Sequence, residues 1–444
     1  MMQSVELFSG CGGLALGIAR AGFEHVRLVE WDEAACATLA HNQRRGVMYA
    51  RDWPFSQGDV RLVDWMAIPG DDLDLVTGGP PCQPFSIGGK HAGKSDARDM
   101  WPEAVRAVRE VQPKAFIFEN VRGLARPAFA EYLTWITTNL SVPSSARYDD
   151  ETHAHHLGRM MRQGIAARKY DVLVLKVNAA DYGAAQKRHR VIVAGLRRDL
   201  GGKIAPPIPT HSRERLLWDQ WISGDYWTRH GIHAPSGPKT ADRRMVNTLS
   251  TRLNAPPEAP WRTVRDALVG LGEPNGDNDH GHPDGARVYP GHTGSPLDEP
   301  AKALKAGDHG VPGGENMMVR HDGSVRYFTV REAARLQGFP DEWGFVGSWS
   351  GNMRQLGNAV PTELANALGR WISDIIGAAS LAWGKGARGP SRHLHVVGLG
   401  RAHNARDERR QQSGPKPARR MTCTRPPPRW RYRVSAVPSP SRAR

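Results

Sequence analysis

The first 200 residues alternate short apolar segments with amphipathic ones, and this alternation restricts the possible folds more than any other feature of the sequence. The segments expected to form strands are residues 5–8, 26–29, 73–77, 115–118, 172–177 and 191–194. Residues 14–21 and 103–111 have the apolar spacing that is typical of helices. Strands that alternate with helices form a mostly parallel sheet with helices on both faces. The expected fold is therefore an α/β, doubly wound domain over residues 1–200.

A glycine-rich turn, residues 10–13 (GCGG), lies between the first expected strand and the first expected helix. Glycines at this place allow a tight turn and let the backbone approach a ligand at the helix N-terminus. Glu30 ends the next strand, where its carboxylate can accept hydrogen bonds from ribose hydroxyls. Trp31 could stack on an adenine ring, and Asp59 could reach the same pocket. This pattern fits a nicotinamide dinucleotide as well as S-adenosylmethionine.

Cys82 lies on a proline-rich segment, residues 79–86 (GPPCQPFS), that follows an expected strand. Ligands of open α/β sheets bind at the carboxyl ends of strands, so a thiol held there is placed to attack a substrate. Cys11 and Cys36 are instead predicted to be buried apolar residues. Together with Cys82 and Cys423 they are the four cysteines of the chain. The four include no CxxC pair, which excludes a disulfide framework and a zinc knuckle.

Six motifs, in this order, resemble those of the DNA (cytosine-5) methyltransferase family of bacterial restriction–modification systems. They are residues 8–13 (FSGCGG), 80–83 (PPCQ), 119–121 (ENV), 186–190 (QKRHR), 331–340 (REAARLQGFP) and 357–361 (GNAVP). The resemblance covers most of residues 4–376. It implies a Rossmann-like catalytic domain, S-adenosylmethionine as the methyl donor without a metal, and double-stranded DNA from which the target cytosine is flipped out.

The resemblance also implies roles for individual residues. The Cys82 thiolate would add to carbon 6 of the cytosine, and Glu119 would hold a proton for the ring, since burial could raise its pKa. Arg190 would bind the cytosine carbonyl, and Arg188 a phosphate or the loop that carries Cys82. An extended backbone would place both arginines on one face. The implied cofactor-binding residues are Phe8, Gly10, Gly12, Gly13, Glu30, Trp31, Asp59, Pro80 and Asn358, and the implied DNA-binding residues are Gln83, Ser86 and Arg331.

The later parts of the chain differ in composition from the first 200 residues. Residues 201–325 are rich in Pro, Gly, His and Trp, and are expected to form a loop-rich target-recognition domain. Residues 326–380 would return to the catalytic domain, and residues 381–444 would form a disordered basic tail. Residues 385–444 hold 16 basic and two acidic residues, whereas the rest of the chain holds 44 basic and 43 acidic ones. DNA binding by the body of the protein must therefore come from locally placed Arg and Lys.

Other classes of protein explain less of the sequence. The nearest alternative is an RNA (tRNA) cytosine-5 methyltransferase with the same motifs, but the long segment 201–325 favours duplex DNA. A nicotinamide-dependent oxidoreductase explains only the glycine turn, and a non-catalytic DNA-binding protein leaves Cys82 and Glu119 without a role. No apolar run reaches about 18 residues, so no membrane span is expected. The expected protein is a monomer of the bacterial cytoplasm, associated with the nucleoid, that protects DNA from a cognate restriction endonuclease.

Overall fold

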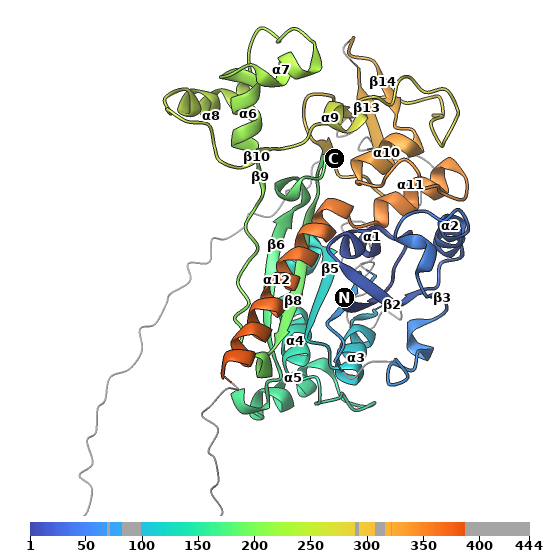
Figure 1. Ribbon diagram of the computed structural model, residues 1–444, viewed down its shortest axis with the longest axis vertical. Helices are drawn as coiled ribbons and strands as arrows, with labels where there is room; N and C mark the ends of the chain where they lie inside the picture. Colours follow the sequence, from blue (N-terminus) through green and yellow to red (C-terminus); the bar gives the residue numbers. More distant parts are fainter. Residues whose placement is uncertain (69–71, 82–98, 289–292, 307–315, 321, 387–444) are drawn as a thin grey trace, which may run out of the picture. The chain divides into compact units, whose positions relative to one another are not determined.

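The computed structural model describes residues 1–68, 72–81, 99–288, 293–306, 316–320 and 322–386, which belong to one compact unit, Met1–Gly389. A seven-stranded sheet in the order β3-β2-β1-β4-β5-β8-β6 forms its centre (Figure 1). These strands are β1 (Met2–Leu7), β2 (Phe23–Glu30), β3 (Phe55–Gln57), β4 (Leu75–Gly78), β5 (Ala115–Val121), β6 (Tyr170–Asn178) and β8 (His189–Arg197).

The sheet is mostly parallel, as predicted. β1, β2, β3, β4 and β5 run in one direction, and β8 is antiparallel to both of its neighbours, β5 and β6. The strand order reverses at β1, which lies between β2 and β4. This reversal creates the switch point at which open α/β sheets bind ligands, outside the carboxyl ends of the strands.

Two helical layers cover the sheet, because successive side chains of each buried strand point to opposite faces. In β5, Phe116 and Phe118 pack with α3 (Trp101–Val111), α4 (Ala130–Ser141) and α5 (His153–Arg162). Ala115 and Ile117 pack on the other face with α1 (Gly13–Arg20) and α12 (Thr362–Gly386). The long α12 therefore packs against the central sheet. It runs to Gly386, so the first six residues assigned to the tail are helical.

A third core joins the glycine turn to the later part of the chain. It contains residues of α1 and α2 (Glu33–Arg44) together with α9 (Val264–Leu268), α10 (Val330–Leu336) and α11 (Trp349–Asn358). Thr329 and Glu332 form a capping box that starts α10, and Thr263 and Asp266 form one that starts α9. Other short strands are β7 (Gln186–Lys187), β11 (Ser295–Pro296), β12 (Ala301–Lys302), β13 (Met317–Val319) and β14 (Val325–Tyr327).

The predicted target-recognition segment begins with three helices that have small cores of their own. These are α6 (Arg213–Trp221), α7 (Asp225–His230) and α8 (Thr240–Ser250), and the strands β9 (His211–Ser212) and β10 (Ala259–Pro260) flank them. Leu216, Tyr226 and Trp227 form one core, and Leu217, Val246 and Leu249 form another. The tryptophans of this segment thus pack these helices.

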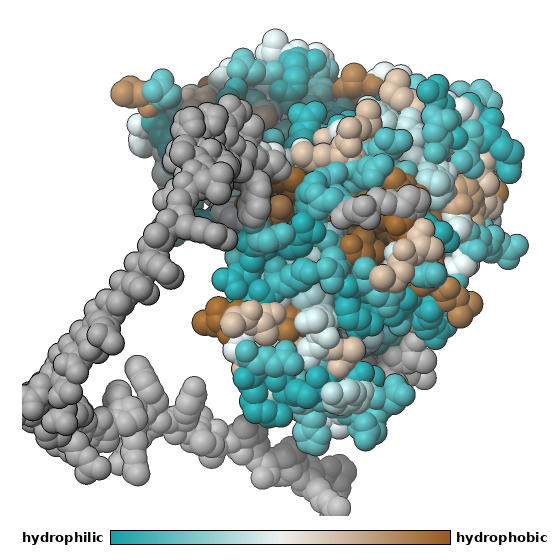
Figure 2. Space-filling view, turned by 60° about the horizontal axis from the view of Figure 1, so that its bottom comes forward, coloured by the Kyte–Doolittle hydropathy of each residue, from teal (hydrophilic) through white to brown (hydrophobic). Residues whose placement is uncertain are grey.

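The face seen in Figure 2 is mostly hydrophilic, and its hydrophobic residues form separate small groups. None of the helices in the described part of the chain combines the length and the apolar character that a membrane span requires.

Candidate active site

The turn that follows β1 has an unusual backbone conformation. Phe8, Gly10 and Gly12 have positive φ angles of 58°, 53° and 92°. A positive φ is strained for an aromatic residue, and such strain gathers at functional sites. The turn leads directly into α1 and lies at the switch point between β1 and β4. The predicted cofactor turn therefore occupies the place where this sheet can bind a ligand.

Glu30, the last residue of β2, holds this turn in place. Its Oε2 accepts a hydrogen bond from the amide of Gly10 at 2.7 Å, and its Oε1 accepts from the amides of Trp31 and Asp32 at 2.9 and 2.8 Å. Burial raises the pKa of the Glu30 carboxyl, and these amides oppose that rise. The side chain of Trp31 is largely exposed. Both residues thus lie beside the turn, and their contacts with a cofactor stay predictions.

The three glycines of the turn have different surroundings. No atom of the described residues lies within 4 Å of the position that a Cβ would take at Gly10. At Gly12 a Cβ would lie 3.0 Å from both Leu39 and Trp343, and at Gly13 it would lie 2.5 Å from the carbonyl oxygen of Val360. Gly10 therefore leaves room for a ligand, whereas the other two glycines are needed for packing against α2 and the later part of the chain.

Asp59 follows β3 and starts a short 3₁₀ turn. Its carboxylate accepts from the amide of Arg61 at 2.9 Å and pairs with the Arg61 guanidinium, which lowers the pKa of Asp59. The Asp59 carboxylate is therefore already engaged by Arg61, and its predicted contact with the cofactor stays a prediction.

Asn120 joins the carboxyl ends of β4 and β5. Its Nδ2 donates to the carbonyl oxygen of Pro80 at 3.0 Å, and its Oδ1 accepts from the amide of Val121 at 2.9 Å. The start of the segment that leads to Cys82 is thus fixed to the end of β5. Cys82 itself, Gln83 and Ser86 lie outside the described residues.

Glu119 and Arg190 form an ion pair between β5 and β8. Arg190 Nε contacts Glu119 Oε1, and only 12% of the arginine side chain and 10% of the glutamate side chain are exposed. Arg190 pairs with Val121, so β8 starts where β5 ends. A Cβ at Gly79 would lie 3.7 Å from Glu119 Oε2. The predicted acid and the predicted base-binding arginine therefore meet beside the segment that carries Cys82.

Arg188 has surroundings that differ from the prediction. It is buried, and its guanidinium donates to the carbonyl oxygens of Leu304, Gly357 and Ala359 at 2.9, 2.6 and 3.0 Å. A side chain so buried does not reach a DNA phosphate in this conformation. Arg188 and Arg190 also do not lie on one continuous strand, because β7 ends at Lys187 and β8 begins at His189. The contacts of the Arg188 guanidinium are to the segments around residues 304 and 357–359, and its predicted contact with the loop that carries Cys82 stays a prediction.

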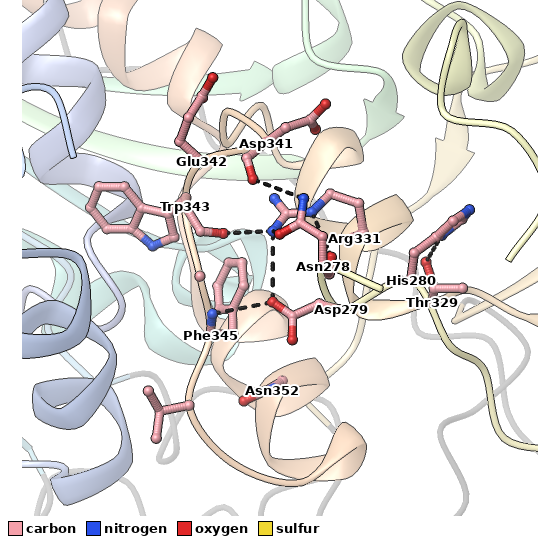
Figure 3. A network of polar contacts seen from close by, with 12 residues as sticks. Asn278, Asp279, His280, Thr329, Arg331, Asp341, Glu342, Trp343, Phe345 and Asn352 are labelled. Carbon is pink, nitrogen blue, oxygen red and sulfur yellow. Dashed lines mark hydrogen bonds and ion pairs between the residues drawn. The ribbon is translucent and has the colours of Figure 1, made fainter. Parts of the chain in front are cut away.

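Arg331 requires a correction, because it was predicted to bind DNA. Figure 3 shows its guanidinium enclosed by polar groups, and the residue has no exposed surface. It donates to the carbonyl oxygens of Asn278, Pro340 and Trp343 at 3.2, 3.1 and 2.8 Å, and it lies 3.6 Å from Asp279. Arg331 therefore braces α10 against two loops. Through Trp343, whose ring lies over Gly12, this brace also supports the cofactor turn.

Two buried glutamines connect β7, α10 and α11, and they were not identified from the sequence. Gln186 donates to the carbonyl oxygen of Leu336 and to Gln337 Oε1, each at 2.9 Å. Gln337 in turn donates to the carbonyl oxygen of Leu356. Both glutamines lie inside the quoted motifs, so their position there was the available signal. Leu356 belongs to α11, and Asn358, the last residue of that helix, is exposed. Its predicted cofactor contact stays a prediction.

Glu6 is a further buried acid, on β1 directly before the turn. Thr77 Oγ1 donates to its Oε2 at 3.0 Å, and the amide of Ala15 also lies within reach of the carboxylate. Burial raises the pKa of Glu6 to about 8. A charged residue between the apolar Val5 and Leu7 was the signal in the sequence.

The raised pKa makes stability depend on pH in one direction. Below about pH 4.5 both the folded and the unfolded chain carry the Glu6 proton, and as the pH rises toward 8 only the folded chain keeps it. Folding stability should therefore fall by a few kcal/mol, roughly, across this window. Glu6→Gln should remove that part of the decline in Tm between pH 5 and 8. Glu24→Gln, exposed on β2, is the control, and identical pH profiles for Glu6→Gln and the wild type would contradict the assignment.

Cys11, Cys36 and His156 have surroundings that agree with structural roles. Cys11 and Cys36 are buried, and Cys11 lies in the core that joins α1 to α10. His156 accepts from Trp135 Nε1 at 3.1 Å through its Nδ1, which leaves its Nε2 to donate to Ser145 O at 2.7 Å. Within the described ranges, no three His, Cys, Asp or Glu residues are grouped as metal ligands would be.

An open, mostly parallel sheet with one antiparallel strand next to its edge, a glycine-rich turn at its switch point and an acid–arginine pair beside it defines a Rossmann-like methyltransferase fold. The family model described as C-5 cytosine-specific DNA methylase matches residues 2–143 and 277–374, more than half of the chain. This chain therefore belongs to the C-5 cytosine-specific DNA methylase family, and its enzyme class is DNA (cytosine-5) methyltransferase. The resemblance drawn from the six motifs is confirmed.

Similar proteins agree with this assignment. Type II methyltransferase M.NgoMIV of Neisseria gonorrhoeae is 33% identical over 375 residues, which are 83% of this chain and 96% of that protein. Type II methyltransferase M.PspPI of Psychrobacter sp. is 32% identical, over 84% of this chain and 80% of that protein. Among solved structures, a Spodoptera frugiperda DNMT2 mutant has a TM-score of 0.50 at 13% identity, over 84% of this chain and 100% of that one, which shows the fold alone.

Proposed function

We propose that this enzyme transfers a methyl group from S-adenosylmethionine to carbon 5 of a flipped cytosine in a specific duplex sequence, through a covalent adduct with Cys82. The observation that carries the proposal is the Glu119–Arg190 ion pair, which lies beside the start of the Cys82 segment at the carboxyl ends of β4 and β5. A base bound there would meet a nucleophile, an acid and a cation at once.

The turn after β1 fits the cofactor that the family uses. The open side of Gly10 gives a ligand access to the backbone at the start of α1, where amide groups can bind a carboxylate. Glu30 and the exposed ring of Trp31 suit a ribose and an adenine, and Phe8, Asp59, Pro80 and Asn358 would complete the pocket. When bound, S-adenosylmethionine supplies the electrophilic methyl group.

The chain's own residues then divide the work. The Cys82 sulfur forms a bond to carbon 6 of the cytosine, which makes carbon 5 nucleophilic. Glu119 holds the proton at ring nitrogen 3, and Arg190 binds the cytosine carbonyl oxygen. After carbon 5 has gained the methyl group, a base or water removes its proton, the electron pair re-forms the double bond, and Cys82 leaves carbon 6 as the thiolate.

The glycines of the turn allow the cofactor proposal to be separated from packing. Gly13→Ala should lower folding stability by about 1–3 kcal/mol, because its Cβ would press on Val360. Gly10→Ala places its methyl group in the open space but puts alanine at a φ of 53°, so it should cost about 1 kcal/mol of stability and, in addition, weaken S-adenosylmethionine binding. Thermal melts and calorimetric titration with S-adenosylmethionine measure the two effects. Normal cofactor affinity in Gly10→Ala would show that the ligand does not approach this side of the turn.

The reaction itself is tested with tritiated S-adenosylmethionine and unmethylated genomic duplex DNA. We expect tritium in the DNA and 5-methylcytosine at a defined sequence by bisulfite sequencing. Transfer to tRNA with no transfer to any duplex would favour the alternative RNA enzyme and overturn the proposal. The same sequencing identifies the recognition site.

The names of the bacterial relatives support a wider setting for this activity. We assign target recognition to residues 201–325, and the function to protection of DNA from a cognate restriction endonuclease. Each of the six motifs occurs within one chain, so a monomer suffices. An enzyme with this substrate in a bacterium would work in the cytoplasm, at the nucleoid.

A further inference from the structure

α8 has one face in the core and one face in solvent. Val246 and Leu249 are buried against Leu217 of α6, and Met245 packs against the same core. The opposite side of the helix is exposed, and so is Arg252, two positions after the last residue of the helix, Ser250. We call this exposed set the outer face of α8, and it consists of Arg243, Arg244, Asn247, Thr248 and Arg252.

The outer face of α8 carries cations that are not balanced nearby. Asp242 is the one acidic residue of α8, and it pairs with Arg213 of α6. Other arginines of this region are also paired, Arg215 with Asp219 and Arg229 with Asp266. Arg243, Arg244 and Arg252 form no ion pair with another described residue. Because the body of the chain is nearly balanced in charge, three unpaired arginines on one short surface are a distinct local feature.

We propose that the outer face of α8 enters the major groove of the DNA and reads base pairs next to the target cytosine; this inference rests on the proposed function. Arginine can bind the two acceptors of guanine, and asparagine can bind adenine, each through two hydrogen bonds. The Thr248 methyl group can contact thymine. An α-helix is about 10–12 Å in diameter and fits the major groove, which is about 12 Å wide. With 11 residues, α8 is about 16 Å long.

Contacts at the start of α8 tie it to the strand that precedes the catalytic arginine. Glu299 pairs with Lys187 of β7 at 3.0 Å through one oxygen and with Lys239, at the N-cap of α8, through the other. Lys187 lies three positions before Arg190. Lys187, Asp242 and Glu299 also line one pocket. The start of α8 is therefore held next to the chain segment that leads into the active site, as a reading element near the flipped base requires.

The residues of the outer face should have separable effects. Arg244→Gln and Asn247→Ala should remove base contacts, and each should change the sequence preference at one position, or lower kcat/KM at the native site about tenfold or more. Arg243→Gln should weaken DNA binding at every sequence and reduce its dependence on salt, as expected for a phosphate contact. These side chains are exposed, so the Tm of each variant should stay near that of the wild type.

The experiment maps 5-methylcytosine by bisulfite sequencing in cells that express the full chain or one variant, and measures DNA KM at two salt concentrations in vitro. Arg162→Gln, an equally exposed arginine on α5, is the matched control and should behave as the wild type. If the wild type methylates a defined site and all α8 variants keep that site, KM and salt dependence, the assignment of α8 is wrong while the proposed function stands. If the wild type methylates no DNA, both fail together.

Discussion

Cys82→Ser should reduce methyl transfer by at least about 10³-fold while leaving S-adenosylmethionine binding unchanged. A serine hydroxyl is far less acidic than a thiol, so it supplies almost no anion to attack carbon 6. The segment that carries Cys82 includes Pro80, whose carbonyl oxygen accepts a hydrogen bond from Asn120. The substitution changes one atom beyond this anchor and should leave the cofactor turn intact. Tritium transfer to DNA and calorimetric titration with S-adenosylmethionine measure the two quantities.

Two controls make this result specific for a covalent step. Cys423→Ser changes a cysteine beyond the residues that the family model matches, and it should keep full activity. Duplex DNA with 5-fluorocytosine should trap the wild type as a complex that survives denaturation, because no base can remove fluorine from carbon 5. Cys82→Ser should form no such complex. Activity within about tenfold of the wild type in Cys82→Ser would reject Cys82 as the nucleophile.

The positions of the residues proposed to bind the cofactor could be predicted from the sequence because the elements that carry them are local. Glu30 ends β2, Gly10 and Pro80 lie shortly after the ends of β1 and β4, and parallel strands bring their carboxyl ends to one edge. Knowing which segments are strands was therefore enough to place these residues together. The structure adds that Gly12 and Gly13 serve packing, which depends on Trp343 and Val360, more than 300 positions away in the chain.

The arginines were harder to place because their environments depend on strand direction and on distant loops. Arg190 meets Glu119 only because β8 is antiparallel to β5. A parallel β8 would put Arg190 at the opposite edge of the sheet. Arg188 and Arg331 were predicted from motif position to face DNA or a loop, but carbonyl oxygens from segments around residues 278, 304, 343 and 357 enclose them. Those carbonyl oxygens come together only in the tertiary structure. The residue types and spacing near each arginine do not predict that arrangement.

Glu119→Gln should lower kcat by about 10²–10⁴-fold, which is the usual contribution of a positioned acid or base. The amide has nearly the shape of the carboxyl group, and its oxygen can still accept from Arg190. It cannot exchange a proton with ring nitrogen 3 of the cytosine. Single-turnover rates of methyl transfer measure this loss. We expect the DNA KM to change little and the Tm to fall less than in Glu119→Ala, because the amide keeps the hydrogen bond to Arg190 but not the negative charge.

Glu119→Ala provides the contrast that separates chemistry from stability. It leaves the Arg190 cation largely buried without its partner, and breaking a buried ion pair in this way costs about 3–5 kcal/mol. The alanine variant should therefore lose activity and much of its Tm, whereas the glutamine variant should lose activity with a smaller fall in Tm. If Glu119→Gln kept kcat within tenfold of the wild type, Glu119 would serve only to orient Arg190. If both variants lost the same Tm, the activity of neither would report on proton transfer, and the ion pair would be a structural element first.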